Sequence, residues 1–191
     1  MAFLCALRDG HPARLVLQAD TYGIPARVLV HDPPTAVSAS DTLSIGEEPG
    51  EAEPPYAGGT ILEGEDLNGD GWTDVRVMTF FGSGGRMFDV FRYDPRRGRF
   101  EKDTVLSEGG NIRHVAGTSC TRSSWKMGAG THSYMEWCWR GGRWVPTQGE
   151  SWEYSSALSS RDVSVSIHQR HEYRGGRMRL VSADTTRERI R

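Results

Sequence analysis

Residues 66–74 read Asp66-Leu67-Asn68-Gly69-Asp70-Gly71-Trp72-Thr73-Asp74. Three carboxylates and one amide side chain stand at positions 1, 3, 5 and 9 of this loop. Oxygen-rich loops with this spacing suit Ca²⁺, which accepts about 6–8 oxygen ligands in loose geometry. We therefore predict a calcium site whose ligands come from Asp66, Asn68, Asp70, the Trp72 carbonyl and Asp74.

The residues around this motif predict that the loop leads into a β-strand. Gly71 stands at position 6, where a residue without Cβ tolerates the positive φ of a sharp turn. Position 12 is Val77 and not the bidentate Glu of helix–loop–helix calcium sites, so water completes the coordination or the sphere is smaller. Val75, Val77 and Thr79 then alternate with other side chains, which is a strand pattern. The alternative is a solvated turn that binds no ion, because turns favour the same residues.

Length and composition predict a single all-β domain over residues 1–191. The chain has 191 residues, of which 37% are hydrophobic, with 23 Gly and 9 Pro. Abundant turn residues favour short strands over long helices. We predict an antiparallel meander, propeller-like or sandwich, with the calcium-type loop between strands. The formal charge of -2 gives no indication of nucleic-acid binding, because nucleic-acid modules are clearly basic.

Alternation and turn signals place the elements along the chain. Gly-Gly pairs at 141–142 and 175–176 predict two tight hairpins. Residues 32–57 are acidic and rich in proline, so we expect an excursion over the surface. Residues 119–130 are polar and are expected to be irregular. About ten to twelve short strands are expected, at 13–19, 26–31, 75–80, 87–93, 111–118, 134–139 and 163–168, with others opening at Phe100, at 144–145 and at 178–181.

The cysteines and the N-terminus give information on the cellular compartment in which the protein resides. Cys120 and Cys138 lie in expected strands and could pair in an oxidising compartment, whereas free buried thiols are expected in the cytosol. No segment approaches the ~20 apolar residues of a membrane span, and no signal peptide is visible. We therefore expect a cytoplasmic protein without a membrane partner, or a periplasmic one if the native N-terminus is longer.

The sequence carries no pattern of catalytic residues. It has no nucleophile elbow, no flanking signature of a catalytic thiol and no phosphate-binding loop. We expect a protein that is not an enzyme. A calcium-dependent hydrolase is the alternative from another class, and a calcium-stabilised carbohydrate-binding module is a third.

Two groups of residues are candidates for binding another protein. Exposed Trp, Tyr, Phe and Arg are typical anchors of protein interfaces. The first candidate is the turn at residues 81–86, with Phe81, Ser83 and Arg86. The second is the 119–130 segment, with Arg122, Trp125 and Lys126.

Beyond these patterns, residues 60–183 resemble a family of bacterial immunity proteins that protect against effectors of type IV or type VI secretion systems. The likeness rests on the loop pattern, on a Gly-rich turn and on the final hairpin through Tyr173-Arg174-Gly175-Gly176-Arg177-Met178. It also rests on Phe88-Asp89-Val90-Phe91-Arg92-Tyr93-Asp94-Pro95-Arg96-Arg97-Gly98-Arg99-Phe100.

The resemblance implies a propeller-like β fold, bound Ca²⁺ and a one-to-one complex with a toxin whose active site an exposed loop plugs. The turn at residues 81–86 is the first choice for that loop. Well-known relatives are exported and block lysozyme-like effectors. Since no signal peptide is visible, we expect an intracellular toxin such as a nuclease, with a lysozyme-like cell-wall hydrolase as the alternative.

Overall fold

The computed structural model describes residues 2–8, 10–21, 23–46, 61–126, 128 and 130–189. These residues form three antiparallel sheets in which strand order follows chain order. The predicted all-β antiparallel meander is therefore confirmed. Among the residues described, no helix is long and apolar enough to cross a membrane.

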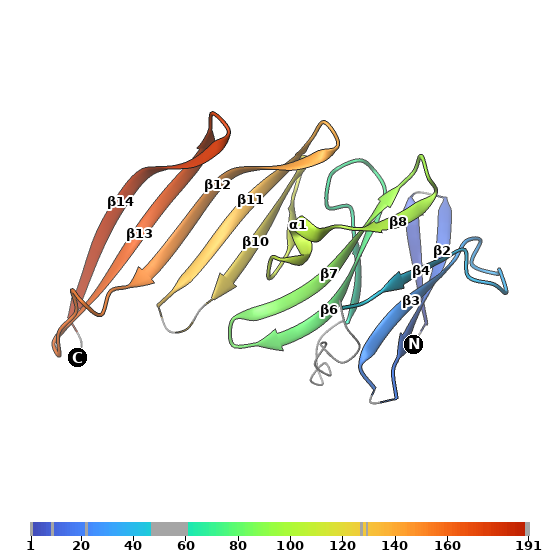
Figure 1. Cartoon of the computed structure of the whole chain (residues 1–191), viewed down its shortest axis with the longest axis horizontal. Coiled ribbons are helices and arrows are strands. Elements are labelled where there is room, and N and C mark those ends of the chain that lie inside the picture. Colours follow the sequence, from blue (N-terminus) through green and yellow to red (C-terminus); the bar gives the residue numbers. More distant parts are fainter. Residues whose placement is uncertain are drawn as a thin grey trace.

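The sheets follow one another along the long axis of the molecule (Figure 1). The first sheet contains β1 (Ala2–Arg8), β2 (His11–Ala19), β3 (Pro25–His31) and β4 (Asp41–Ser44). The second contains β5 (Leu62–Glu65), β6 (Asp74–Gly82), β7 (Gly85–Asp94) and β8 (Arg99–Lys102). The third contains β9 (Arg113–Val115), β10 (Cys120–Lys126), β11 (His132–Arg140), β12 (Arg143–Tyr154), β13 (Val163–Arg174) and β14 (Arg177–Arg189). One short helix, α1 (Thr104–Ser107), links the second and third sheets.

The central hairpin of β6 and β7 is buried on both faces. Val75 and Val77 pack in a core shared with the first sheet, whereas Met78 packs in a second core that includes Trp144 of the third sheet. Strand β7 divides in the same way, because successive side chains point to opposite faces. Its Phe91 belongs to the first core and its Phe88 to the second. The second sheet is therefore held between its two neighbours.

One charged residue of β6 lies inside this arrangement. The Arg76 guanidinium contacts Glu63 at 2.7 Å and Glu65 at 2.9 Å, and both carboxylates come from the neighbouring β5. It also donates to the carbonyl of Ile112 and lies over the Phe88 ring. A buried guanidinium needs such partners, because an unpaired buried charge is costly.

Three segments differ from the elements expected from sequence. Residues 120–126 form β10, not the irregular segment expected for 119–130. The expected strand at 111–118 is reduced to β9, which covers three residues. Within the 32–57 excursion, β4 pairs with β3 and buries Leu43, which is 3% exposed, while 47–57 lie outside the described residues. Polar strands are hard to recognise because pairing with neighbours, and not hydrophobic alternation, holds them in the sheet.

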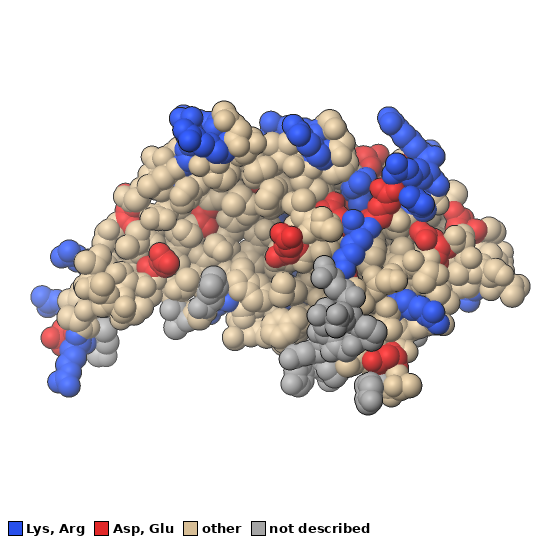
Figure 2. Space-filling view, in the orientation of Figure 1, with Lys and Arg blue, Asp and Glu red and all other residues tan. Residues whose placement is uncertain are grey.

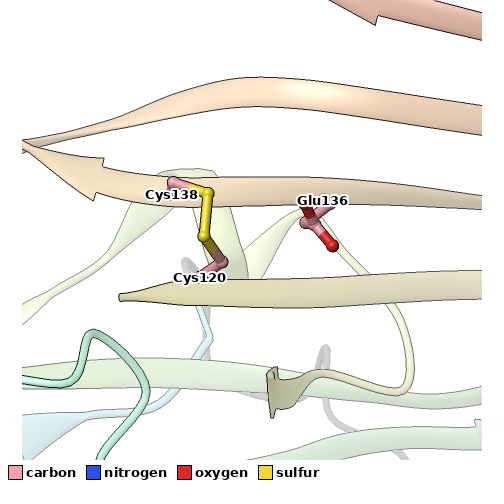
Figure 3. Close-up of side chains that lie close together, drawn as sticks. All are labelled: Cys120, Glu136 and Cys138. Atoms are coloured by element: carbon pink, nitrogen blue, oxygen red, sulfur yellow. A yellow bond between two sulfur atoms is a disulfide. The ribbon is translucent and has the colours of Figure 1, made fainter. Parts of the chain in front are cut away.

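Cys120 and Cys138 form a disulfide bond across β10 and β11 (Figure 3). The two residues are direct partners in the antiparallel register. Cys5, in β1, is a free thiol. The sequence left this pairing open, and the register decides it by bringing the two side chains together.

The central hairpin provides a matched pair of phenylalanines for testing the two-sided core. Phe88 is 1% exposed and Phe81, on the same hairpin, is 49% exposed. Phe88→Ala is expected to lower the free energy of unfolding by about 3–5 kcal/mol, because it removes a buried ring and leaves a cavity. Phe81→Ala is expected to change it by less than about 0.5 kcal/mol. Urea unfolding of both variants checks this, and equal losses would contradict the assignment of the core.

Candidate functional site

The Asp66–Asp74 loop connects β5 to β6 and turns at two glycines. Gly69 has a φ of 72° and Gly71 a φ of 86°, both in the left-handed region. The turn predicted at position 6 of the motif is therefore present. Leu67 is buried in the second core and so fixes the loop to the body of the protein. Its carbonyl also accepts hydrogen bonds from Thr121 and from His114, which come from the third sheet.

The loop carboxylates bind backbone amides of the loop itself. Asp66 accepts from the amides of Gly69 at 2.7 Å, Asp70 at 3.2 Å and Gly71 at 2.8 Å. Asp70 accepts from the Trp72 amide at 2.9 Å and from the Asn68 side-chain amide at 2.9 Å. These bonds are typical of turns in which acidic side chains replace a backbone acceptor.

Asp74 is the most deeply buried carboxylate of the loop, with 1% exposure. Its two oxygens accept from the amides of Leu67 and Tyr93, each at 3.0 Å. Burial is the largest cause that raises the pKa of its carboxyl to about 8, and the negative charges of Asp70 and Asp66 raise it further. The two amide bonds oppose this rise. The loop therefore holds a carboxyl that lacks a compensating positive charge.

The chemical types of the ligand atoms in this loop suit a hard divalent cation. Three carboxylates and one amide oxygen are ligands that Ca²⁺ prefers. Within the described part of the chain, none of the three carboxylates forms an ion pair with a basic side chain. Their oxygens do not converge within 4.8 Å, and the one triad of His, Cys, Asp or Glu ligand atoms that does so there is Cys120, Glu136 and Cys138. The disulfide occupies both sulfur atoms of that triad (Figure 3).

The two predicted interface groups lie next to each other. The amide of Lys126 donates to the carbonyl of Gly84 at 3.0 Å, which joins the end of β10 to the β6–β7 turn. A Cβ on Gly84 would lie 2.6 Å from the Lys126 carbonyl and 2.8 Å from the Trp125 ring. Glycine is therefore required for this close approach. Segments that are about forty residues apart in sequence form one continuous surface.

Two of the three basic residues in these groups are held by carboxylates of the protein, whereas Lys126 forms no ion pair among the described residues. Arg86 pairs with Glu63 at 2.9 Å and lies over the Phe88 ring. Arg122 pairs with Glu136 at 3.0 Å and lies over Tyr134. Phe81 projects at the turn, and Trp125 is half-buried, with its ring against Gly84 and Gly110. Phe81 is thus the aromatic side chain that can enter a partner, while Trp125 lines the adjoining cleft.

A cleft of about 720 Å³ adjoins this surface. It extends from Trp125 and Met87 across the third sheet to Met135, Gly149 and His171. The β-register places Met135 beside Gly149 and Gly149 beside His171. Sequence reasoning did not identify these last three residues, because each lies on a different strand and none carries a local motif. The signal is that the three residues are direct partners across paired strands, which depends on knowing the register.

The comparisons with known proteins concern the fold. The structure is similar to that of a Xanthomonas protein described as related to a type IV secretion system, with a TM-score of 0.60 and 17% sequence identity. The match covers 95% of this chain and 93% of that chain. No protein-family model and no curated protein matches the sequence. The chain therefore shares the whole fold of a protein related to secretion, at a distance where sequence similarity is slight.

The buried Asp74 predicts a distinctive pH dependence in protein kept free of metal by a chelator. The unfolded chain titrates this carboxyl near its ordinary pKa of 3.8, whereas the folded protein titrates it at about 8. The folded state binds more protons between these values, so the Asp74 contribution to the free energy of unfolding falls as pH rises from 3.8 to about 8. Urea unfolding across this range measures the slope. Asp74→Asn is expected to remove that component, and an unchanged slope in the variant would contradict the assignment.

Proposed function

We propose that the protein is an immunity protein, which binds an antibacterial toxin effector one-to-one and covers the toxin's active site. The main support for this proposal is that the β6–β7 turn and the end of β10 form one continuous surface. Phe81 projects from a hairpin whose base is buried on both faces. A loop held in place before binding loses little conformational entropy on association, which favours affinity.

The composition of the surface suits a protein interface. Aromatic side chains and arginine are enriched among residues that dominate binding energy. Phe81 and Trp125 provide the aromatic anchors, and the neighbouring cleft can accept a side chain of the partner. Arg86 is fixed by Glu63 and so gives the rim a defined shape, whereas Arg122 is fixed by Glu136 on the face of β10 opposite to Trp125. Such a protein acts by occlusion and catalyses no reaction itself.

The fold comparison supports the cellular setting of this proposal. The similar Xanthomonas protein is described as related to a type IV secretion system. Secretion systems that deliver toxins to other bacteria require the producing cell to hold a neutralising protein. We extend this setting to the present chain as part of the proposal.

The disulfide bears on where the toxin acts. Disulfides persist in oxidising compartments such as the bacterial periplasm and are rare in the cytosol. Cys120 and Cys138 are bonded, so we favour a toxin that acts outside the cytoplasm over the intracellular nuclease expected from sequence. A lysozyme-like cell-wall hydrolase is the effector class that this compartment suggests.

Survival of cells that express a candidate toxin tests the function. The chain, directed to the periplasm, is expected to restore growth when a cell-wall hydrolase effector encoded beside it is directed to the same compartment. Phe81→Ala and Trp125→Ala are each expected to weaken toxin binding by about tenfold or more, because they remove aromatic anchors. The affinities are measured by calorimetry with purified toxin.

Leu158→Ala is the matched control, because Leu158 is also an exposed apolar residue but lies in the loop between β12 and β13. It is expected to bind like the wild type. Protection only in the cytoplasm would favour an intracellular toxin. Consumption of a cell-wall substrate by the purified chain, with no toxin present, would contradict the proposal.

We also propose that the Asp66–Asp74 loop binds Ca²⁺ in a structural role, with Asp66, Asn68, Asp70 and Asp74 as side-chain ligands and Trp72 contributing its carbonyl. The uncompensated charge around buried Asp74 supports this. A cation would offset the repulsion among the three carboxylates and stabilise the start of β6.

Calcium is expected to raise the melting temperature of the wild type by about 5–10 °C at concentrations well above the dissociation constant, since it binds the folded state. A chelator should reverse the gain, and Asp70→Ala should abolish it. Asp20→Ala is the control, because Asp20 also accepts a backbone amide, that of Ile24, but lies in the turn between β2 and β3. It should retain the calcium response. A wild-type melting temperature that is the same with calcium and with chelator would refute the site.

A further inference from the structure

Basic side chains gather on the turns along one edge of the molecule. Figure 2 shows Lys and Arg atoms on projections over the β11–β12 and β13–β14 turns, with more over the β7–β8 turn. The topology explains the alignment, because alternate turns of an antiparallel meander lie at the same end of the strands. The β6–β7 turn, which carries Phe81, lies at the opposite end.

Two of these turns repeat one sequence. Arg140-Gly141-Gly142-Arg143 joins β11 to β12, and Arg174-Gly175-Gly176-Arg177 joins β13 to β14. In each hairpin the two arginines are direct partners across the strands. Like charges opposite each other destabilise a hairpin by about 0.2–1 kcal/mol. The fold does not need these pairs, so their repetition points to a function.

The glycines leave the apex of each turn without side chains. Gly141 and Gly142 have φ values of 57° and 79°, and Gly175 and Gly176 have 60° and 83°. These angles suit the two-residue turns that match strand twist, and they favour glycine. The backbone apex and its two flanking guanidinium groups can therefore approach a flat surface together.

Most of the guanidinium groups on these two turns have no carboxylate partner. Among the residues that the structure describes, Arg140, Arg143 and Arg177 form no ion pair, while Arg174 pairs with Glu172. The third turn is different, because Arg97 and Arg99 are paired with Glu101. The whole chain has a formal charge of -2, so this positive edge is a local segregation of charge.

We propose that the two Arg-Gly-Gly-Arg turns bind the phosphate headgroups of an anionic lipid surface. Guanidinium groups bind phosphate through paired hydrogen bonds. The two turns lie two strands apart, and the register of β12 and β13 also displaces them along the strands, which suits a surface with many phosphates better than one small anion. Tyr173, which is 36% exposed, lies directly below the second turn, and tyrosine is enriched at the level of lipid headgroups.

Other partners fit this edge less well. A protein partner would be expected to bury aromatic anchors at the centre of the contact, but Trp139 lies under Arg92 and Trp144 is buried. Single-stranded nucleic acid would need several exposed rings for the stacking of successive bases, whereas Tyr173 is a single exposed ring beside the second turn. The disulfide also favours an oxidising compartment such as the bacterial periplasm. Membrane surfaces are the abundant anionic partners there. With the edge on a lipid surface, the Phe81 turn would face away from it and remain open to a toxin.

Sedimentation with vesicles tests the proposal on the full chain. The wild type is expected to bind vesicles of phosphatidylcholine mixed with phosphatidylglycerol, and not vesicles of phosphatidylcholine alone. Binding should be lost between about 0.1 M and about 1 M salt, as the Debye length falls from about 10 Å to about 3 Å. Each arginine near the surface contributes about fivefold in affinity, so R140Q/R143Q/R174Q/R177Q should lose at least about a hundredfold.

R27Q/R161Q/R187Q/R189Q is the matched control, because it removes the same charge from exposed arginines outside the two turns. It should bind like the wild type, with circular dichroism confirming that both variants fold. Equal losses in the two variants would show a nonspecific charge effect and overturn the proposal. So would failure to bind the mixed vesicles, or equally tight binding to duplex DNA that depends on the same four arginines. Toxin affinity of the turn variant should be unchanged, which separates this test from the test of immunity.

Discussion

Valine and phenylalanine side chains from both faces of β6 and β7 enter two separate cores, and the other sheets are placed by this two-sided burial. A one-residue shift in the register of this hairpin would move every side chain to the opposite face, and so into the core that it does not fit. The loop that enters β6 and the turn that leaves it are consequently fixed relative to both neighbouring sheets. The acidic loop and the Phe81 turn are the two ends of the same constrained strand.

Charged groups connect the same elements. Glu63 of β5 binds Arg76 inside the molecule and Arg86 at its surface, so one carboxylate links the core to the rim of the proposed interface. Buried pairs of this kind add little stability by themselves but penalise any arrangement that separates them. At the other end of β6, Asp74 accepts two amides and has no positive partner among the residues that the structure describes. The strand therefore begins at a site with excess negative charge and ends at a surface where Arg86 is neutralised by Glu63.

The two proposed binding surfaces, one for a toxin and one for lipid, lie at opposite ends of the strands of the meander. Turns at one end of the strands carry Phe81 and approach Trp125, whereas turns at the other end carry the paired arginines. The disulfide between β10 and β11 covalently links two strands of the third sheet, one of which also reaches Gly84. Contact with a lipid surface and contact with a toxin would thus use different ends of one rigid body.

Local pattern was sufficient for the class of fold, for the Gly-Gly hairpins and for the turn at Gly71, because strand alternation and positive φ depend on neighbouring residues. It was insufficient for β10, which is polar and is defined by its partners β9 and β11. It also could not show that Lys126 meets Gly84, that Cys120 faces Cys138, or that Met135, Gly149 and His171 share a cleft. The sequence by itself determined which residues turn, which alternate and which carry oxygen ligands. Only the tertiary structure decided which distant residues meet, because β-register and the stacking of sheets arise from contacts between strands far apart in the chain.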